Sequence, residues 1–290
     1  MTIALKAPLF MAMERRLPGL SKNHRRLARH IAAHYQTVAF STISELARAS
    51  GVSEATIVRF CRALDFAGYP AFQGEVRRLV RADLKGTERF SRTRPSAPKH
   101  PAPLAPVIEK ELENIEGLQR SFDRAAFDKA VKAIAGAAEV IVAGSRSTAS
   151  LAAHLWFGLS KIGIAAERVL AVSSEVYDRL VRAGPDTLLV LLSYPRYLTE
   201  HIELQAFAKK RRLRTLLLTD SAFAPLKGDI TLAAPAESAS FVAFHAAPMI
   251  LINALLSELS LADPDATLAA LSRFEALAEE RGYFHREATQ

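Results

Sequence analysis

The sequence of 290 residues predicts two domains, an all-α helix-turn-helix domain and an α/β domain with a parallel five-stranded sheet flanked by helices. Three observations lead to this fold class. The chain is longer than one typical domain. Its first part shows consecutive helical patterns, whereas its second part alternates apolar strands with helices. A proline-rich segment separates the two parts. The predicted bounds are 1–85 for the helix-turn-helix domain, 86–106 for the linker and 107–290 for the α/β domain.

Two short helices near the N-terminus form the most distinctive local pattern. Thr42 and Glu45 have the spacing of a capping box, which marks the start of a helix. This helix ends at Gly51, and Ser53 is placed to cap the next one. Two helices joined by a short turn that contains glycine predict a helix-turn-helix.

The second of these helices is expected to insert its N-terminal part into the major groove of DNA. Ile57, Cys61 and Leu64 recur on its inner face, so the remaining positions point outward. The preceding helix offers cations to the phosphate backbone. An ordinary helical bundle with a solvated basic face is the alternative. The residues expected to contact DNA are Ser53, Ala55, Thr56, Arg59 and Arg62, together with Lys22, Arg25 and Arg26 on the preceding helix.

The charge distribution agrees with a nucleic-acid-binding domain at the N-terminus. The chain has a net charge of +8, and residues 1–80 contain twelve Lys or Arg against five Asp or Glu, a balance of +7. The excess of positive charge therefore lies in the smaller domain, as is typical of a nucleic-acid-binding module joined to a second unit. A solvated basic surface would give the same composition.

The second domain shows strands and helices in alternation, which predicts a parallel sheet covered on both faces. Five prolines between positions 95 and 106 predict a semi-extended linker before it. The predicted strands are 140–143, 168–172, 188–192, 215–218 and 230–233. The predicted helices are 107–121, 125–137, 148–162, 175–183, 199–211, 222–227, 242–261 and 264–280.

The segment ISELARASGVSEATIVRFCRALDFAGYPAF resembles the N-terminal helix-turn-helix of the RpiR family of bacterial transcriptional regulators. Proteins of this family continue into a sugar isomerase (SIS) domain, and the second domain has the corresponding order of strands, loops and helices. The resemblance implies a SIS-like fold for the second domain. It also implies a homodimer or dimer of dimers on operator DNA with two-fold half-sites.

Two loops that follow predicted strands are suited to hold an anion, because ligands bind beyond the carboxyl ends of parallel strands. In the first loop, VIVAGSRSTAS, Gly144 allows a tight turn, and the hydroxyl groups that follow it lie at the start of a helix. The N-terminus of a helix is suited to bind phosphate. The alternative role for these serines is helix capping. In the second loop, LLVLLSYPRYLTE, Arg196 adds a bidentate anion clamp.

The resemblance to SIS domains implies that both loops together hold the phosphate of a sugar phosphate. The second loop departs from the serine- and glycine-rich family pattern at Pro195, Arg196 and Leu198. This departure leaves open whether the effector carries a phosphate group. The residues expected to bind the effector are Gly144, Ser145, Arg146, Ser147, Thr148, Ser193, Tyr194, Arg196, Thr199 and Glu237.

These patterns predict a DNA-binding transcriptional regulator controlled by a small phosphosugar or a related anionic carbohydrate metabolite. The alternative is a sugar-phosphate isomerase with an accessory DNA-binding module, for which Glu237 and His245 are the candidate general bases. The common dinucleotide, Walker, zinc-protease and serine-hydrolase motifs are absent from the sequence, so we expect no catalytic residues, cofactor or metal.

The sequence also predicts a cytoplasmic protein that does not enter a membrane. The longest strongly apolar stretch, 246–256, is about half the length needed to cross a bilayer and is interpreted as a core helix. The first residues lack the pattern of an export signal. The single cysteine, Cys61, allows no internal disulfide, which fits a reducing compartment.

Overall fold

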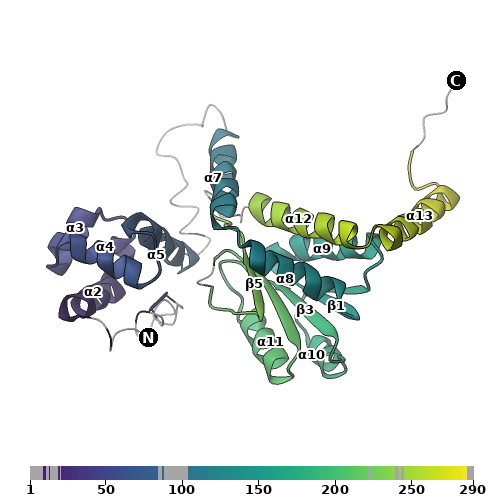
Figure 1. Ribbon diagram of the computed structural model, residues 1–290, viewed down its shortest axis with the longest axis horizontal. Helices are drawn as coiled ribbons and strands as arrows, with labels where there is room; N and C mark the ends of the chain where they lie inside the picture. The colour runs from purple at the N-terminus through teal and green to yellow at the C-terminus, as the bar shows by residue number, and fades with distance from the viewer. Residues whose placement is uncertain are drawn as a thin grey trace. The chain divides into compact units, whose positions relative to one another are not determined.

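The computed structural model describes residues 9, 10, 13, 19, 21–83, 87, 104–221, 224–238, 242 and 245–285. The chain divides into two compact units, one that contains helices α2 to α5 and one that contains the sheet and helices α7 to α13 (Figure 1). Most of the predicted linker lies outside the described residues, and the predicted domain bounds remain a prediction. Within the described residues, no single helix has both the length and the apolar character needed to cross a membrane.

Among the described residues of the N-terminal unit, four helices pack around one apolar core. Ile57, Phe60 and Cys61 of α4 are fully buried in it, and burial raises the pKa of the Cys61 thiol to about 12. Phe60 also meets the ring of Phe72 edge-on, with the centroids 6.1 Å apart. The inward face predicted for α4 is therefore confirmed. The helices are α2 (Lys22–Val38), α3 (Ile43–Ser50), α4 (Glu54–Ala63) and α5 (Tyr69–Asp83).

Local hydrogen bonds explain why α3 and α4 begin and end where they do. The Thr42 hydroxyl accepts from the Glu45 N–H at 3.2 Å, and the Glu45 carboxylate accepts from the Thr42 N–H at 2.7 Å. Gly51 ends α3 with a φ of 64°, a left-handed conformation that glycine adopts without steric cost. Ser53 then caps α4 by accepting from the Thr56 N–H at 3.3 Å. The predicted helix-turn-helix is confirmed.

The C-terminal unit contains the predicted five-stranded sheet, and all its strands are parallel, in the order β2-β1-β3-β4-β5. The strands are β1 (Glu139–Ala143), β2 (Ala166–Val169), β3 (Thr187–Leu192), β4 (Arg214–Thr219) and β5 (Ile230–Ala233). The helices are α7 (Ala105–Ser121), α8 (Arg124–Ala135), the 3-10 turn η3 (Arg146–Thr148), α9 (Ala149–Lys161), α10 (Ser174–Val181), α11 (Thr199–Lys210), α12 (Ala246–Ala262) and α13 (Pro264–Arg281).

The central strands are apolar along their whole length because both faces of the sheet are covered. Every residue of β3 is buried. One core cluster joins alternate strand residues such as Val140 and Val142 to α8, α9 and α12. The other cluster joins Ile141 and Ala143 to α10 and α11. The helices thus form layers on both sides of the sheet, as Figure 1 shows.

Several predicted elements have other bounds in the structure, such as the helix predicted from 242, which begins at Ala246, and one predicted helix is wrong. The predicted helix 222–227 is wrong where it can be seen, because residues 224–228 form no helix. Pro225 disfavours a helical residue before it, and Gly228 approaches the backbone of β4 and β5 too closely for a side chain. The second strand begins at Ala166 rather than 168 because it pairs with Val140 there. The helix predicted from 148 begins at Ala149, after a 3-10 turn.

Candidate DNA-binding surface and effector site

The outer face of α4 carries four of the five residues predicted to contact DNA, namely Ser53, Ala55, Arg59 and Arg62, all exposed. The prediction that Thr56 points outward is wrong, because Thr56 is only 7% exposed. Its position, one turn before the buried Phe60, places it on the inner face of the helix. Its hydroxyl is hydrogen-bonded to that of Ser53 at 2.9 Å.

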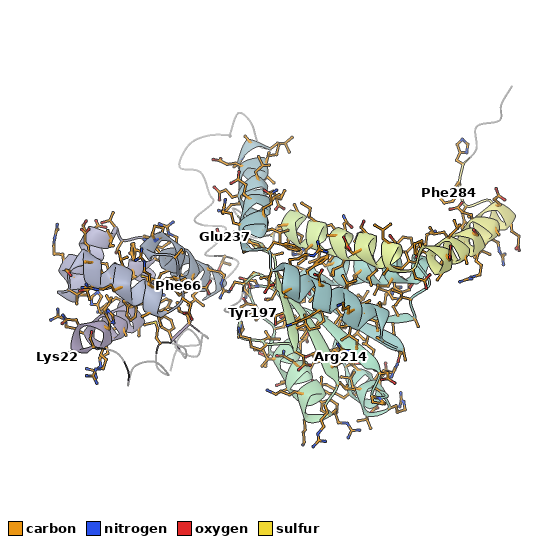
Figure 2. All side chains as sticks on the ribbon, viewed as in Figure 1. Lys22, Phe66, Tyr197, Arg214, Glu237 and Phe284 are labelled. Carbon is orange, nitrogen blue, oxygen red and sulfur yellow. The ribbon has the colours of Figure 1, made fainter. Side chains whose placement is uncertain are left out.

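The predicted cations of α2 are exposed, and one of them lies next to the turn before α4. Lys22, Arg25 and Arg26 are all exposed, and Lys22 stands at the beginning of α2 (Figure 2). The guanidinium of Arg26 lies against the turn between α3 and α4, since a Cβ atom added at Gly51 would be 3.3 Å from its Nη2 atom. Of the predicted phosphate-binding cations, Arg26 therefore lies beside the turn that leads into the helix predicted to read bases.

A side-chain hydrogen bond that the sequence spacing did not indicate joins the two helices of the motif. The Ser44 hydroxyl of α3 donates to the Glu54 carboxylate of α4 at 2.5 Å. Glu54 lies in the first turn of α4, where a carboxylate is favoured by the helix dipole. This bond helps to fix the angle between α3 and α4.

The strand order brings the two predicted effector loops together. β1 and β3 are neighbours at the centre of the sheet, with Ala143 paired to Leu191. The chain leaves β1 for β2 on one side and leaves β3 for β4 on the other. The loops after β1 and β3 therefore open at a topological switch point, which is where ligands bind in open parallel sheets.

The first loop contains a buried hydroxyl with no hydrogen-bond partner. Gly144 is required there, because a Cβ atom would lie 2.8 Å from the Thr148 carbonyl oxygen. Ser145 is 4% exposed, does not cap the following turn, and its Oγ atom has no partner among the described residues. Thr148 has a structural role, since its hydroxyl donates to the Ser145 carbonyl at 2.9 Å. Arg146 and Ser147 are exposed.

The second loop contains another such group at Tyr194. Its hydroxyl is buried without a partner among the described residues, and desolvation raises its pKa. The adjacent Ser193 is fully buried, and its hydroxyl lies 3.1 Å from Nδ1 of His201. Arg196 and Thr199 are exposed, and no side chain caps the N-terminus of α11.

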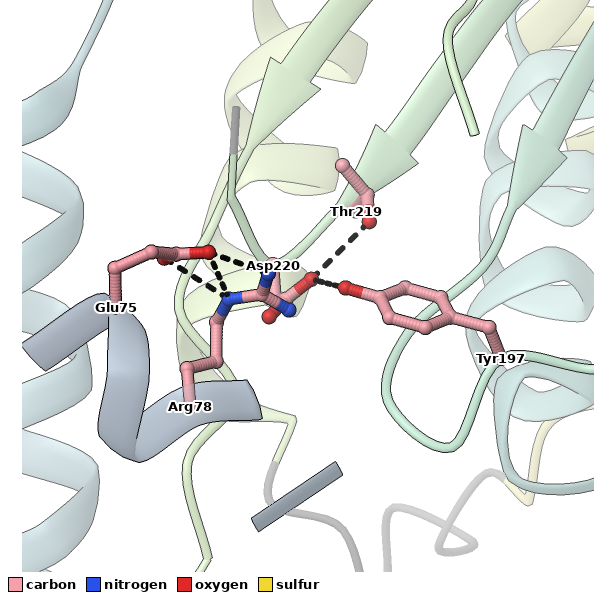
Figure 3. A network of polar contacts seen from close by, with 5 residues as sticks. All are labelled: Glu75, Arg78, Tyr197, Thr219 and Asp220. Carbon is pink, nitrogen blue, oxygen red and sulfur yellow. Dashed lines mark hydrogen bonds and ion pairs between the residues drawn. The ribbon is translucent and has the colours of Figure 1, made fainter. Parts of the chain in front are cut away.

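The far end of the second loop is anchored to the end of β4. The Tyr197 hydroxyl donates a short hydrogen bond to Asp220, and the Thr219 hydroxyl donates to the same carboxylate oxygen at 3.3 Å. Figure 3 shows Asp220 between these two side chains. The anchor limits how far the loop can move.

A third partnerless group comes from the start of α12. The Nε2 atom of His245 is buried without a partner in the described part of the chain, and its ring centroid lies 6.3 Å from that of Tyr194. Burial lowers the pKa of His245 below 6.5, so the imidazole is neutral at pH 7. Ser145, Tyr194 and His245 together present neutral polar groups whose burial costs free energy until a ligand binds them.

Glu237 lies beside this site but is already engaged. Figure 2 labels Glu237 near one end of α7. The Glu237 carboxylate is 3.0 Å from the Lys110 ammonium of α7. Its backbone N–H and C=O are both hydrogen-bonded to the Asn114 side chain. Across the described residues, no group of three or more His, Cys, Asp or Glu side chains is placed to hold a metal ion.

Comparisons with known proteins agree with this two-part arrangement. The model of the helix-turn-helix domain of the rpiR family matches residues 9–80. The HTH-type transcriptional regulator HexR of Escherichia coli is 25% identical over 223 residues, which cover 76% of this chain and 75% of HexR. HexR of Pseudomonas aeruginosa is 26% identical over 226 residues, which cover 77% of each chain.

Solved structures extend the similarity to the C-terminal unit. The sugar isomerase domain of an RpiR transcription factor from Sphaerobacter thermophilus superposes with a TM-score of 0.57 and 28% identity, covering 59% of this chain and 96% of that domain. The Vibrio vulnificus NanR protein complexed with ManNAc-6P shares the fold at 19% identity and a TM-score of 0.58, over 94% of this chain and 98% of NanR.

The chain is a DNA-binding transcriptional regulator with a separate α/β domain. Residues 9–80 match the helix-turn-helix domain of the rpiR family, and the C-terminal unit has the fold of a sugar isomerase (SIS) domain. The resemblance seen in the sequence is confirmed.

The sequence did not single out the contacts of α7 and α11 with the site. Asn114 is 2% exposed and lies one turn before the buried Leu118, so a polar residue occupies a position where the helix pattern calls for an apolar one. A polar residue at an apolar position of the helix pattern was the sequence signal that could have indicated a buried contact of Asn114. His201 carries no comparable signal, because its partner Ser193 lies in the preceding loop.

Proposed function

We propose that the C-terminal domain binds a small phosphorylated sugar or a related anionic carbohydrate, and that this binding controls how the N-terminal domain binds operator DNA through α4. The observation that carries the proposal is a set of buried polar groups that have no hydrogen-bond partner among the described residues: Ser145 and Tyr194 in the two loops at the switch point, and His245 beside Tyr194. A ligand with hydroxyl groups would satisfy all three. NanR, which shares the fold, was solved with ManNAc-6P.

The two ends of such a ligand would meet different chemistry. The N-termini of α9 and α11 carry no side-chain cap, so their first-turn N–H groups suit a phosphate. The exposed Arg146 and Arg196 lie in the same loops and add positive charge. The neutral Tyr194 and His245 suit sugar hydroxyls, which both donate and accept hydrogen bonds.

A thermal-shift screen of the purified full-length protein tests this site. Glucose 6-phosphate, ManNAc-6P and arabinose 5-phosphate are compared with their unphosphorylated sugars and with inorganic phosphate. We expect a sugar phosphate to raise the melting temperature more than phosphate or the sugar alone. Ser145→Ala should reduce that shift, whereas Ser272→Ala, on the exposed side of α13, should leave it unchanged. Equal shifts in all three proteins would refute the proposed site.

The domain acts in this proposal as a sensor rather than an isomerase. An isomerase needs a general base that is placed to take a proton from the sugar. Of the two candidates, Glu237 is paired with Lys110 and His245 has no carboxylate hydrogen-bonded to it within the described residues. Incubation with the stabilising sugar phosphate separates the two functions, because appearance of the isomeric sugar phosphate would establish catalysis.

We also propose that the protein acts in the cytoplasm as a homodimer that joins two half-sites of operator DNA. Support comes from the outer faces of α7, α12 and α13, which expose many large apolar side chains. Beside them lies an apolar groove of ≈ 410 Å³ between α7 and α12. A large exposed apolar face is typical of an interface. The exposed residues include Val107, Ile108, Leu112, Ile250, Leu261, Leu268 and Leu277.

The dimer is tested by sedimentation equilibrium of the full chain. Ile250 and Leu268 are 43% and 66% exposed, so a charge at either position leaves the fold intact but prevents burial in an interface. We expect the wild type to sediment as a dimer or tetramer and Ile250→Glu or Leu268→Glu as smaller species. Unchanged mass in both variants would place the interface elsewhere.

A further inference from the structure

Helix α7 is the first described helix after the helix-turn-helix domain along the chain, and it is bonded to two segments beside the candidate effector site. One segment, 234–238, follows β5 and contains Glu237. The other is the start of α12 at His245 and Ala246. Both connections are separate from the exposed apolar face of α7 and from the candidate anion-binding loops after β1 and β3.

Asn114 joins α7 to the first segment through both ends of its amide group. Its Oδ1 atom accepts from the Glu237 backbone N–H at 3.0 Å, and its Nδ2 atom donates to the Glu237 carbonyl at 2.8 Å. Lys110, one turn earlier, pairs with the carboxylate of the same residue at 3.0 Å. Close packing continues at Gly117, where an added Cβ atom would lie 3.1 Å from Pro235. A buried amide held at both ends fixes the segment to the helix.

Glu111 joins α7 to the second segment. Its Oε1 atom accepts from the Ala246 N–H at 3.2 Å, in the first turn of α12. His245 is the N-cap residue of α12 but makes no capping bond with its own side chain, so Glu111 supplies a cap from another helix. A carboxylate at this place is also favoured by the dipole of α12. Glu111 and Asn114 are themselves linked, at 3.3 Å.

The same α12 start presents the partnerless imidazole of His245 to the site, next to Tyr194. A ligand that hydrogen-bonds His245 therefore acts on a residue whose neighbour, Ala246, is held by α7. A change in the position of either segment requires α7 to follow or these hydrogen bonds to break. Breaking bonds to a buried amide is costly, so movement of the helix is favoured.

We propose that Asn114 and Glu111 are positioning residues that transmit occupancy of the effector site to α7, and through α7 to the preceding chain that leads to the DNA-binding domain. This inference rests on the proposed function, because it requires an effector at the site. Transmission is a coupling free energy: the effector changes DNA affinity only if it binds the two positions of α7 with different affinity.

The test measures effector binding and DNA binding separately in the full-length protein. The effector is the sugar phosphate with the largest shift in the screen above, and the DNA is a fragment selected by the protein from a random pool. In the wild type we expect saturating effector to change the Kd for DNA by about 5- to 150-fold, the usual range of allosteric coupling. In Asn114→Ala and in Glu111→Gln, that ratio should fall toward one while the effector still raises the melting temperature.

Glu116→Gln is the matched control for Glu111→Gln. Glu116 lies on the same helix, is exposed, and pairs only with Arg120 among the described residues, so its coupling ratio should equal that of the wild type. An unchanged ratio in both Asn114→Ala and Glu111→Gln would overturn the inference. Loss of effector binding in both folded variants would also overturn it, because the residues would then determine affinity instead of transmission. A wild type without any effector shift would refute the proposed function itself.

Discussion

The Tyr194 hydroxyl should make opposite contributions to the stability of the free protein and to effector binding. It is buried without a hydrogen-bond partner among the described residues, in a side chain that is 4% exposed. An unsatisfied buried polar group costs about 1–3 kcal/mol. Tyr194→Phe removes that group and keeps the ring, which packs in the main core of the α/β domain. We expect the free protein to gain about 1 kcal/mol of unfolding free energy.

The gain is measured by thermal unfolding of the ligand-free protein. For a domain of this size, about 1 kcal/mol corresponds to a rise of roughly 2–4 °C in Tm. With saturating effector present, most of this gain should disappear, because the lost hydrogen bond weakens binding by about 2- to 12-fold, a free energy similar in size to the gain. Tyr177→Phe is the control, since Tyr177 is half-buried on α10 and its ring packs against Phe207. A Tm that falls in free Tyr194→Phe, or effector affinity equal to that of the wild type, would refute this reasoning.

Three further predictions follow from the same contacts. Arg59→Ala should weaken operator binding by about 1–3 kcal/mol, measured by gel-shift titration, and unchanged affinity would exclude α4 as the recognition helix. Gly144→Ala should destabilise the protein by about 1–3 kcal/mol in thermal unfolding, because its methyl group would lie 2.8 Å from a carbonyl oxygen. Burial lowers the pKa of His201 and of His245 below 6.5, so the unfolded chain takes up protons first as the pH falls. Stability should therefore decrease below pH 6.5, and urea unfolding at pH 7.5 and 5.5 should show a smaller decrease in His245→Asn.

The elements that the sequence predicted well are those set by neighbouring residues. The capping box at Thr42 and Glu45 and the left-handed Gly51 define α3 within ten residues of chain. The strands could be located because a sheet covered on both faces needs continuous apolar runs, of which β3 is the clearest. The adjacency of the loops after β1 and β3, the candidate effector loops, agrees with a general property of parallel sheets.

The sequence failed where distant residues decide the outcome. Asn114 and Glu237 are 123 positions apart, and Glu111 and Ala246 are 135 apart, so no local spacing indicates their hydrogen bonds. Thr56 was misplaced for a different reason. The spacing of Ile57, Cys61 and Leu64 suggested an outward position for it, but the Ser53 side chain bonds its hydroxyl and allows Thr56 to be buried.

The surroundings of Glu237 and His245 favour regulation over catalysis. A general base must be available to the substrate and must give up its proton in every cycle. Here the Glu237 carboxylate pairs with Lys110 and its backbone is held by Asn114, while the residue after His245 is held by α7. A sensor has a different requirement, because the group that contacts the ligand must be connected firmly to an element that can move. In the proposed mechanism, Glu237 and the residue that follows His245 are both hydrogen-bonded to α7, the first described helix after the DNA-binding domain.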